Sequence, residues 1–94
     1  LIYIAPLAKE YQIDCVHFAE NLRNKGFSVI TNYTKFTISH HIKLANKENA
    51  TYMIIYGENE EESKTVLIKN LIKRTQENIK QSKICNYFED LKDK

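Results

Sequence analysis

The segment Tyr52 to Leu71 has the sequence YMIIYGENEEESKTVLIKNL, in which a glycine and a short acidic stretch separate two apolar runs. This order of residues predicts the topology of the chain. The apolar run Tyr52 to Tyr56 is typical of a strand that is buried on both faces. Gly57 and a short acidic turn end this strand, and a second apolar run, Thr65 to Leu71, follows the turn. Because a parallel return needs a crossover of about a dozen residues or more, the second strand is predicted to run antiparallel to the first.

The chain before this segment alternates between strand and helix patterns. Leu1 to Ala5 is a continuous apolar run ended by Pro6, as expected of a central strand. Helical spacing follows from Glu10 to Lys25, and Gly26 stands where a C-terminal helix cap is expected. The apolar positions of this helix are Cys15, Phe18, Ala19 and Leu22.

A second strand and a second helix come next. Phe27 to Thr31 is predicted to be a short strand, Asn32 to Phe36 a polar loop, and Thr37 the N-cap of the helix. One face of this helix carries Ile38, His41, Ile42 and Ala45. The order of elements up to Tyr56 is therefore β-α-β-α-β.

The last third of the chain has the weakest pattern. Ile72 to Ser82 is predicted to be a loop with a short fifth strand around Asn78 to Lys80. A terminal helix is predicted from apolar residues at helical spacing, which are Ile84, Tyr87, Phe88 and Leu91. The chain is therefore an α/β protein with a mixed sheet.

The crossovers predict where a ligand would bind. Two right-handed crossovers, with the first strand between the second and third, create a topological switch point at the carboxyl ends of these strands. The loops meeting there are Ala5 to Lys9, Asn32 to Phe36 and Gly57 to Glu60. An acid on the turn and Lys69 on the returning strand are expected to lie side by side, as an acceptor and a donor that suit the edge of an unstacked base. They supply no nucleophile.

Length and charge limit the function classes. With 94 residues, 43% of them hydrophobic, residues 1–94 form one domain that is too small for a two-lobed enzyme. The chain opens in an apolar run without an initiator Met, which favours a C-terminal fragment of a longer protein. A formal net charge of +2 is far from the strong field of a protein that grips duplex backbones, so any nucleic acid is expected to meet a local patch.

The cysteines and histidines do not predict a metal site. Cys15 and Cys85 lack CxxC spacing and are interpreted as buried small hydrophobic residues, with a disulfide as the second possibility. Neighbouring helical positions point about 100° apart, so His40 and His41 would not converge on one ion. His41 is expected to be packed and hydrogen-bonded, and His40 to face solvent or phosphate. No charged segment precedes a signal-like apolar run, and no apolar run approaches membrane-spanning length, so we expect no membrane partner and a reducing setting, which is the cytoplasm or an organelle matrix.

Four segments carry a family resemblance. They are IAPL at Ile4 to Leu7, AENLRNKGFSV at Ala19 to Val29, HIKLANKENATYMIIYGENE at His41 to Glu60, and TVLIKNL at Thr65 to Leu71 with Gln76 beyond it. In this order and spacing, nearly the whole chain resembles the anticodon-binding domain at the C-terminus of class II aminoacyl-tRNA synthetases, shared by the histidyl, threonyl, prolyl and glycyl enzymes. The histidyl branch is favoured, because the threonyl and prolyl branches usually show an acidic pair and an arginine where this chain has Asn32-Tyr33-Thr34.

The resemblance implies a three-layer α/β/α domain with a mixed, mostly parallel five-stranded sheet and one antiparallel strand, in agreement with the order of elements above. It also implies recognition of a tRNA anticodon, that of histidine tRNA, and not of DNA. The longer enzyme would ligate histidine to its tRNA with ATP and Mg, and we expect it to be a homodimer. This segment alone is expected to be non-catalytic and to hold no cofactor or metal.

Carried over position by position, the resemblance also implies which residues meet the anticodon. Glu60 matches the family's acid after the third strand and Lys69 a basic position on the fourth. The other anticodon-binding candidates are Asn32, Tyr33, Lys43 and Arg74. Carboxylates accept hydrogen bonds from base amino groups, and cations donate to carbonyl oxygens or phosphates.

Each candidate has a structural alternative. Glu60 is one of several acids on a solvated turn, Lys69 can shield a strand edge, and Lys43 can be an ordinary charge on a helix surface. Tyr33 and Phe36 can stack on a splayed base or fold back onto the core.

Two departures from the family pattern bear on the site. His40 and His41 stand where lysines are frequent in the family. Lys73-Arg74-Thr75-Gln76 replaces a threonine-glycine-glutamate-glutamine turn, so the turn must form without its glycine, although the added charges can meet phosphates.

Three other interpretations stay open. The chain can belong to a sister synthetase (threonyl, prolyl or glycyl) or to a noncatalytic synthetase-like module for binding or dimerisation. It can also be a free-standing domain that binds a small molecule at the switch point, although no glycine-rich phosphate loop follows the first strand.

Overall fold

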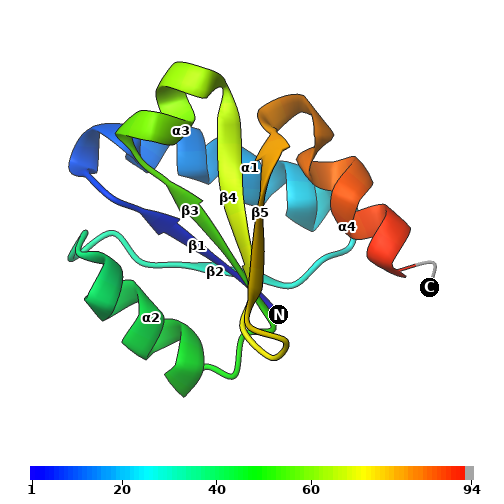
Figure 1. Cartoon of the computed structure of the whole chain (residues 1–94), viewed down its shortest axis with the longest axis horizontal. Helices are drawn as coiled ribbons and strands as arrows, with labels where there is room; N and C mark the ends of the chain where they lie inside the picture. The colour runs from blue at the N-terminus through cyan, green and yellow to red at the C-terminus, as the bar shows by residue number, and fades with distance from the viewer. Residues whose placement is uncertain (93–94) are drawn as a thin grey trace.

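A five-stranded sheet in the order β2-β1-β3-β4-β5 organises the chain (Figure 1). The computed structural model describes residues 1–92 of the 94. The strands are β1 (Ile2–Pro6), β2 (Val29–Thr31), β3 (Tyr52–Tyr56), β4 (Thr65–Asn70) and β5 (Thr75–Lys80). The helices are η1 (Lys9–Tyr11), α1 (Gln12–Asn24), α2 (Ile38–Lys47), α3 (Glu58–Ser63), η2 (Gln81–Lys83) and α4 (Ile84–Lys92). No helix in this described part of the chain combines the length and the apolarity that crossing a membrane requires.

The pairing of the strands confirms the predicted mixed sheet. β1 pairs in parallel with β2 and with β3, so the first strand lies between the second and the third. β4 is antiparallel to β3, and β5 is antiparallel to β4. Four strands therefore share one direction, and β4 alone among the described strands runs against them.

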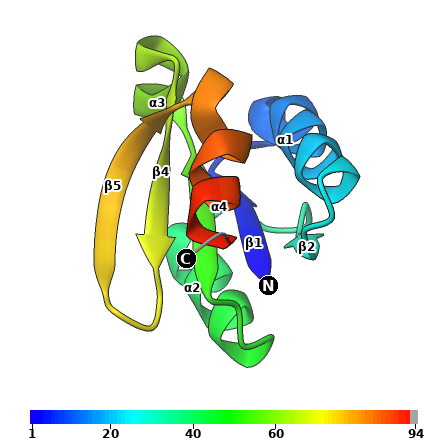
Figure 2. The ribbon, with the colours of Figure 1, turned by 90° about the vertical axis from the view of Figure 1, so that its right-hand side faces the viewer.

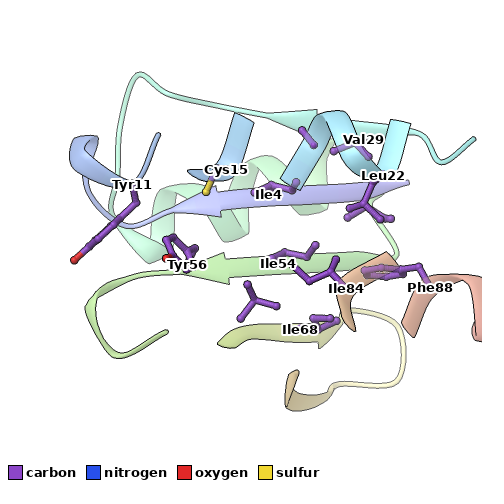
Figure 3. Packing of buried hydrophobic residues seen from close by; sticks show 13 residues of the cluster. Ile4, Tyr11, Cys15, Leu22, Val29, Ile54, Tyr56, Ile68, Ile84 and Phe88 are labelled. Atoms are coloured by element: carbon purple, nitrogen blue, oxygen red, sulfur yellow. The ribbon is translucent and has the colours of Figure 1, made fainter. Parts of the chain in front are cut away.

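Helices cover both faces of the sheet, which confirms the three layers. On one face, Cys15 and Leu22 of α1 and Ile84 and Phe88 of α4 pack against strand residues such as Ile54 (Figure 3). Figure 2 shows α1 and α4 together on this side. On the other face, Ala45 of α2 packs against side chains of β1 and β3, which are Tyr3, Ala5, Met53 and Ile55. β1 and most of β3 are buried, because helices cover both faces of the sheet at these strands. This explains why both strands are continuous apolar runs and do not alternate with polar residues.

Two helix ends test the predicted caps. Gly26 has a φ of +91°, its N–H donates to the Arg23 carbonyl, and the Phe27 N–H donates to the Leu22 carbonyl, so the predicted glycine cap is confirmed. Thr37 is the N-cap residue of α2 with extended backbone, as predicted, but its side chain makes no capping hydrogen bond.

The acidic segment after β3 is a helix, α3, and not the predicted turn. No residue of α3 is buried, so it lacks the apolar period by which helices are found in a sequence. Its stability comes from local effects. Acids in the first turn interact favourably with the positive end of the helix dipole, and Lys64 ends the helix in the left-handed conformation at φ 58°.

β5 is longer than predicted, running from Thr75 to Lys80 where only Asn78 to Lys80 was expected. All of its side chains are exposed apart from Ile79, which packs against the core on the α4 side. A polar edge strand carries little hydrophobic alternation, and this is why its first half is missed in the sequence.

Both cysteines are free thiols. Cys15 is fully buried, and burial, with Asp14 nearby, raises its thiol pKa to about 12. Cys85 is half-buried. The interpretation as small hydrophobic residues is confirmed for Cys15 and holds in part for Cys85.

His41 of α2 forms hydrogen bonds with two residues of β1, which confirms the prediction that it is packed and hydrogen-bonded. Its ring is completely buried, with Nε2 2.8 Å from the Pro6 carbonyl oxygen and Nδ1 2.8 Å from the Tyr3 hydroxyl. A carbonyl oxygen only accepts, so Nε2 carries the proton and Nδ1 accepts from the Tyr3 hydroxyl. His40 departs from the prediction, because its ring is half-buried and its Nε2 is shielded without a hydrogen-bond partner among residues 1–92.

This buried histidine predicts a pH-dependent stability. Burial lowers the pKa of His41 from its ordinary 6.5, the hydrogen bond to Pro6 opposes the shift, and nearby His40 adds to it. Below about pH 6.5, His41 is protonated in the unfolded chain and stays neutral in the folded chain. The free energy of unfolding should therefore fall as the pH drops below about 6.5. Urea unfolding at about pH 7.5 and about pH 5.5, roughly one unit on either side of 6.5, measures this change.

The exposed His17 provides the control. His17→Gln should keep the slope of stability against pH, whereas His41→Gln should flatten it. A wild-type slope that survives the removal of His41 would contradict the assignment.

Candidate nucleic-acid interface

The β4–β5 hairpin has one face that is covered only in part, because Leu67 of β4 packs against the cluster that includes Ala45 of α2 whereas the β5 side chains on that face are exposed. Successive side chains of a strand alternate between faces, and Val66 and Ile68 of β4 and Ile79 of β5 belong to the core beneath α1 and α4. The opposite face, here called the hairpin face, consists of Thr65, Leu67, Lys69, Gln76, Asn78 and Lys80, which the register places opposite one another. Its β5 members are all exposed. In Figure 1, α2 lies to one side of the hairpin rather than in front of it.

Two adjoining hollows mark this face. The amide hollow, of about 410 Å³, lies at the α3 end and is lined by Asn59, Glu60, Ser63, Thr65, Leu67, Gln76 and Asn78. The cationic hollow, of about 370 Å³, lies at the turn end and is lined by Asn46, Lys69, Asn70, Leu71, Arg74 and Gln76. Gln76 borders both hollows, so they form one continuous surface.

Glu60 has a structural role as well as a place in the amide hollow. One of its carboxylate oxygens, Oε1, accepts from the Gly57 N–H at 2.9 Å and so caps α3. Gly57 itself lies against the loop after β1, where a Cβ at position 57 would come within 2.9 Å of Leu7 Cδ1. The second carboxylate oxygen of Glu60 has no hydrogen-bond partner within the described part of the chain.

Lys69 and Arg74 give the other hollow its positive charge. Among residues 1–92 the ion pair that forms joins Lys25 to Glu89, at 3.9 Å and on a different part of the surface. The charges of Lys69 and Arg74 are therefore not neutralised by neighbouring carboxylates, and their donors face the hollow or solvent.

The turn between β4 and β5 forms without glycine. Asn70 organises it, with its side-chain oxygen accepting from the N–H groups of Ile72 and Lys73 at 3.0 and 2.9 Å and its carbonyl accepting from the Arg74 N–H at 2.8 Å. Arg74 stands where the family resemblance places a glycine, and its φ is 58°, in the left-handed region. The geometry that a glycine would adopt freely is thus kept at some cost in backbone strain.

The other three predicted residues lie away from the hairpin face. Asn32 lines a hollow with Tyr3 and Leu44, and its Oδ1 accepts from the backbone and hydroxyl of Thr34. Tyr33 is half-buried and packs against the core beneath α1 and α4, as its structural alternative predicted. Lys43 is exposed on α2 and lines neither hollow.

The structure therefore groups the six predicted residues differently from the sequence. Lys69 and Arg74 share the cationic hollow, and Glu60 lies in the adjoining one. Glu60 and Lys69 are not side by side, because Lys69 pairs with Met53 near the start of β3 whereas Glu60 follows its end. Asn46, Gln76 and Asn78 also line the hollows and were not among the predicted site residues, although the alternation of Gln76 and Asn78 along β5 was an available signal.

The geometry defines a class of protein: a small three-layer α/β domain whose β4–β5 hairpin presents a partly open polar face. The sequence model of one such family, the Anticodon binding domain, matches residues 1–91. The chain belongs to this family.

Known relatives at the sequence level are histidine–tRNA ligases. The chain is 32% identical over 90 residues to the enzyme of Pseudothermotoga lettingae, a match that covers 96% of this chain and 21% of that protein. It is 39% identical over 70 residues to the enzyme of Wolbachia pipientis subsp. Culex pipiens, covering 74% of this chain and 17% of that protein. The chain thus spans about a fifth of the length of these relatives.

Solved structures agree on the fold. The histidyl-tRNA synthetase of S. aureus superimposes with a TM-score of 0.85 at 23% identity, over 93% of this chain and 25% of that chain. The RNA binding domain of threonyl-tRNA synthetase from Cryptosporidium parvum gives 0.84 at 21% identity, over 95% and 22%. At these identities the likeness shows the fold alone.

The capping bond of Glu60 predicts different results for two substitutions. Glu60→Ala removes the acceptor of the Gly57 N–H and should lower the free energy of unfolding by about 1 kcal/mol. Glu60→Gln keeps an acceptor oxygen at the same place and should lose much less. Urea unfolding compares them, and equal losses would show that charge, not the capping bond, is what α3 needs.

The left-handed backbone of Arg74 predicts a stabilising substitution. Arg74→Gly relieves the strain and should raise the free energy of unfolding by up to about 1 kcal/mol, less the entropy that glycine adds to the unfolded chain. Arg74→Ala removes the same charge but keeps the strain, so it is the matched control in the same unfolding assay. If both variants unfold alike, the strain at position 74 is not significant.

Proposed function

We propose that this chain reads the anticodon of a tRNA, that of histidine tRNA, through the hairpin face. In this role it forms the anticodon-binding part of a histidine–tRNA ligase. Single-stranded bases are read along their exposed edges, and both the amide hollow and the cationic hollow present hydrogen-bonding groups at the open surface.

The observation that carries the proposal is the pair of unneutralised cations, Lys69 and Arg74, on a partly open polar face of a chain from this family. The local grouping of charge fits a modest net charge of +2, because a short single-stranded loop is met by a patch and not along a duplex. Relatives named as histidine–tRNA ligases support the choice of tRNA.

The proposal extends to the longer protein. There the chain would serve an enzyme that joins histidine to its tRNA with ATP and Mg, as a homodimer in the cytoplasm. The amino-acid chemistry would belong to residues outside this chain, whose own contribution is to select the tRNA. Within residues 1–92 no three His, Cys, Asp or Glu side chains gather as a metal site requires.

A binding titration tests the proposal. The chain should bind a histidine tRNA transcript more tightly than transcripts with altered anticodons, at one fixed salt concentration because phosphate contacts are salt-dependent. Lys69→Ala should weaken binding of the histidine tRNA by about tenfold, which corresponds to about 1.4 kcal/mol.

Lys25→Ala is the matched control, since it removes one exposed lysine at the end of α1, away from the hairpin face. It should change the affinity far less than Lys69→Ala does. Equal affinity for every anticodon, or the same effect from both lysine substitutions, would rule out anticodon reading at the hairpin face and favour a noncatalytic binding module.

A further inference from the structure

Two amide side chains on β5 have no assigned role. Gln76 and Asn78 are exposed, they point to the hairpin face, and neither side chain makes a hydrogen bond within the described residues. Gln76 borders both hollows and Asn78 lines the amide hollow. An amide presents a donor and an acceptor together, which is the pattern that pairs bidentately with the edge of a base.

Apart from its amide side chains, which are those of Asn59, Gln76 and Asn78, the amide hollow offers acceptors. Ser63 donates its only hydroxyl hydrogen to the Asn59 carbonyl at 2.9 Å, so Thr65 must be the donor in the 2.7 Å contact between the two hydroxyls. Both hydroxyl hydrogens are thus used within the protein, and the free oxygen of Glu60 can only accept. No lysine or arginine lines this hollow. It suits a base that presents N–H groups.

The cationic hollow offers mainly donors. Lys69 and Arg74 have no acceptor atoms in their side chains, and the side-chain oxygen of Asn70 is occupied by the turn. This hollow suits the carbonyl oxygens of a base, or a phosphate. The two hollows therefore complement opposite kinds of base edge.

Spacing along β5 separates the two positions. Gln76 and Asn78 are two residues apart on one strand face, roughly 7 Å. Bases stacked as in a duplex lie only about 3.4 Å apart, so neighbouring bases must unstack to reach the two hollows.

We propose that Gln76 and Asn78 are specificity-determining residues, with two consecutive unstacked nucleotides seated one in each hollow. Asn78, with Glu60, reads the base in the amide hollow, and Gln76 lies between the two bases and contacts the edges of both. This inference rests on the proposed function, because it names the residues that make the anticodon contacts.

Two substitutions of nearly constant size test the inference. Gln76→Met and Asn78→Leu remove the amides without changing the charge, so phosphate contacts and the slope of affinity against salt should stay as in the wild type. The measured quantity is the ratio of the affinities for the histidine tRNA transcript and for transcripts with one anticodon nucleotide replaced. Asn78→Leu should reduce this ratio about tenfold at one anticodon position, and Gln76→Met should reduce it at that position and its neighbour.

Asn86→Leu is the control, since it removes an exposed amide from α4, on the far side of the sheet. It should leave every ratio unchanged. Thermal unfolding of each variant checks that the fold is kept, as expected for exposed positions.

The outcomes separate this inference from the proposed function. If the wild type discriminates among anticodons and both amide variants discriminate equally well, Gln76 and Asn78 are not readers, and the proposed function stands without them. If the wild type itself does not discriminate, both ideas fail. Loss of discrimination with an unchanged salt slope supports the inference.

Discussion

The short connection from β3 to β4 determines how the β4–β5 hairpin is placed, and the candidate nucleic-acid interface depends on that hairpin. The connection is too short to cross the sheet, so it folds into the single small helix α3 and sends β4 back antiparallel. β5 then turns back again and becomes an edge strand. α2 packs over β1 and β3, and Leu67 of β4 joins the same cluster, but the β5 side chains on this face of the hairpin stay exposed.

The two hollows of the open face differ in charge, although Lys80 also lies on this face at its α3 end. Acidic α3 borders one end, whereas Lys69 and Arg74 border the other with no carboxylate close enough to pair with them among residues 1–92. The difference follows from the chain order, since the acids precede β4 and the cations lie at its end and in the turn that follows. A ligand that fills both hollows would meet different chemistry in each, as the proposed short run of splayed nucleotides would.

The sequence predicted the buried parts of the fold best. β1, β3, the two layers of helices and the glycine cap at Gly26 depend on apolar periodicity or on one special residue, and both are visible in the chain. α3 and the first half of β5 were missed because few or none of their side chains are buried. Local dipole and capping effects, or pairing with β4, stabilise them instead.

The candidate site was predicted only in part, for a related reason. Lys69 was found from its place on the returning strand and its match to a basic family position, and Arg74 as a charge added where the turn departs from the family. Their grouping with Gln76 depends on the β4–β5 register, which no periodic signal on an exposed strand fixes. The placement of Asn32 and Tyr33 depends on how one loop packs against the core, and a sequence cannot supply this.

The two ends of the hairpin face also differ in how firmly they are built. The cationic hollow lies between α2, which Ala45 and His41 anchor in the core, and a turn that Asn70 holds with side-chain hydrogen bonds. The amide hollow has α3 as a wall, and α3 buries none of its own residues. Segments of this kind open by local fluctuation well before the rest of a fold does. On the proposed function, one nucleotide would meet a firmly held template and its neighbour an adaptable one, so tolerance for altered or chemically modified bases would lie at the α3 end of the face.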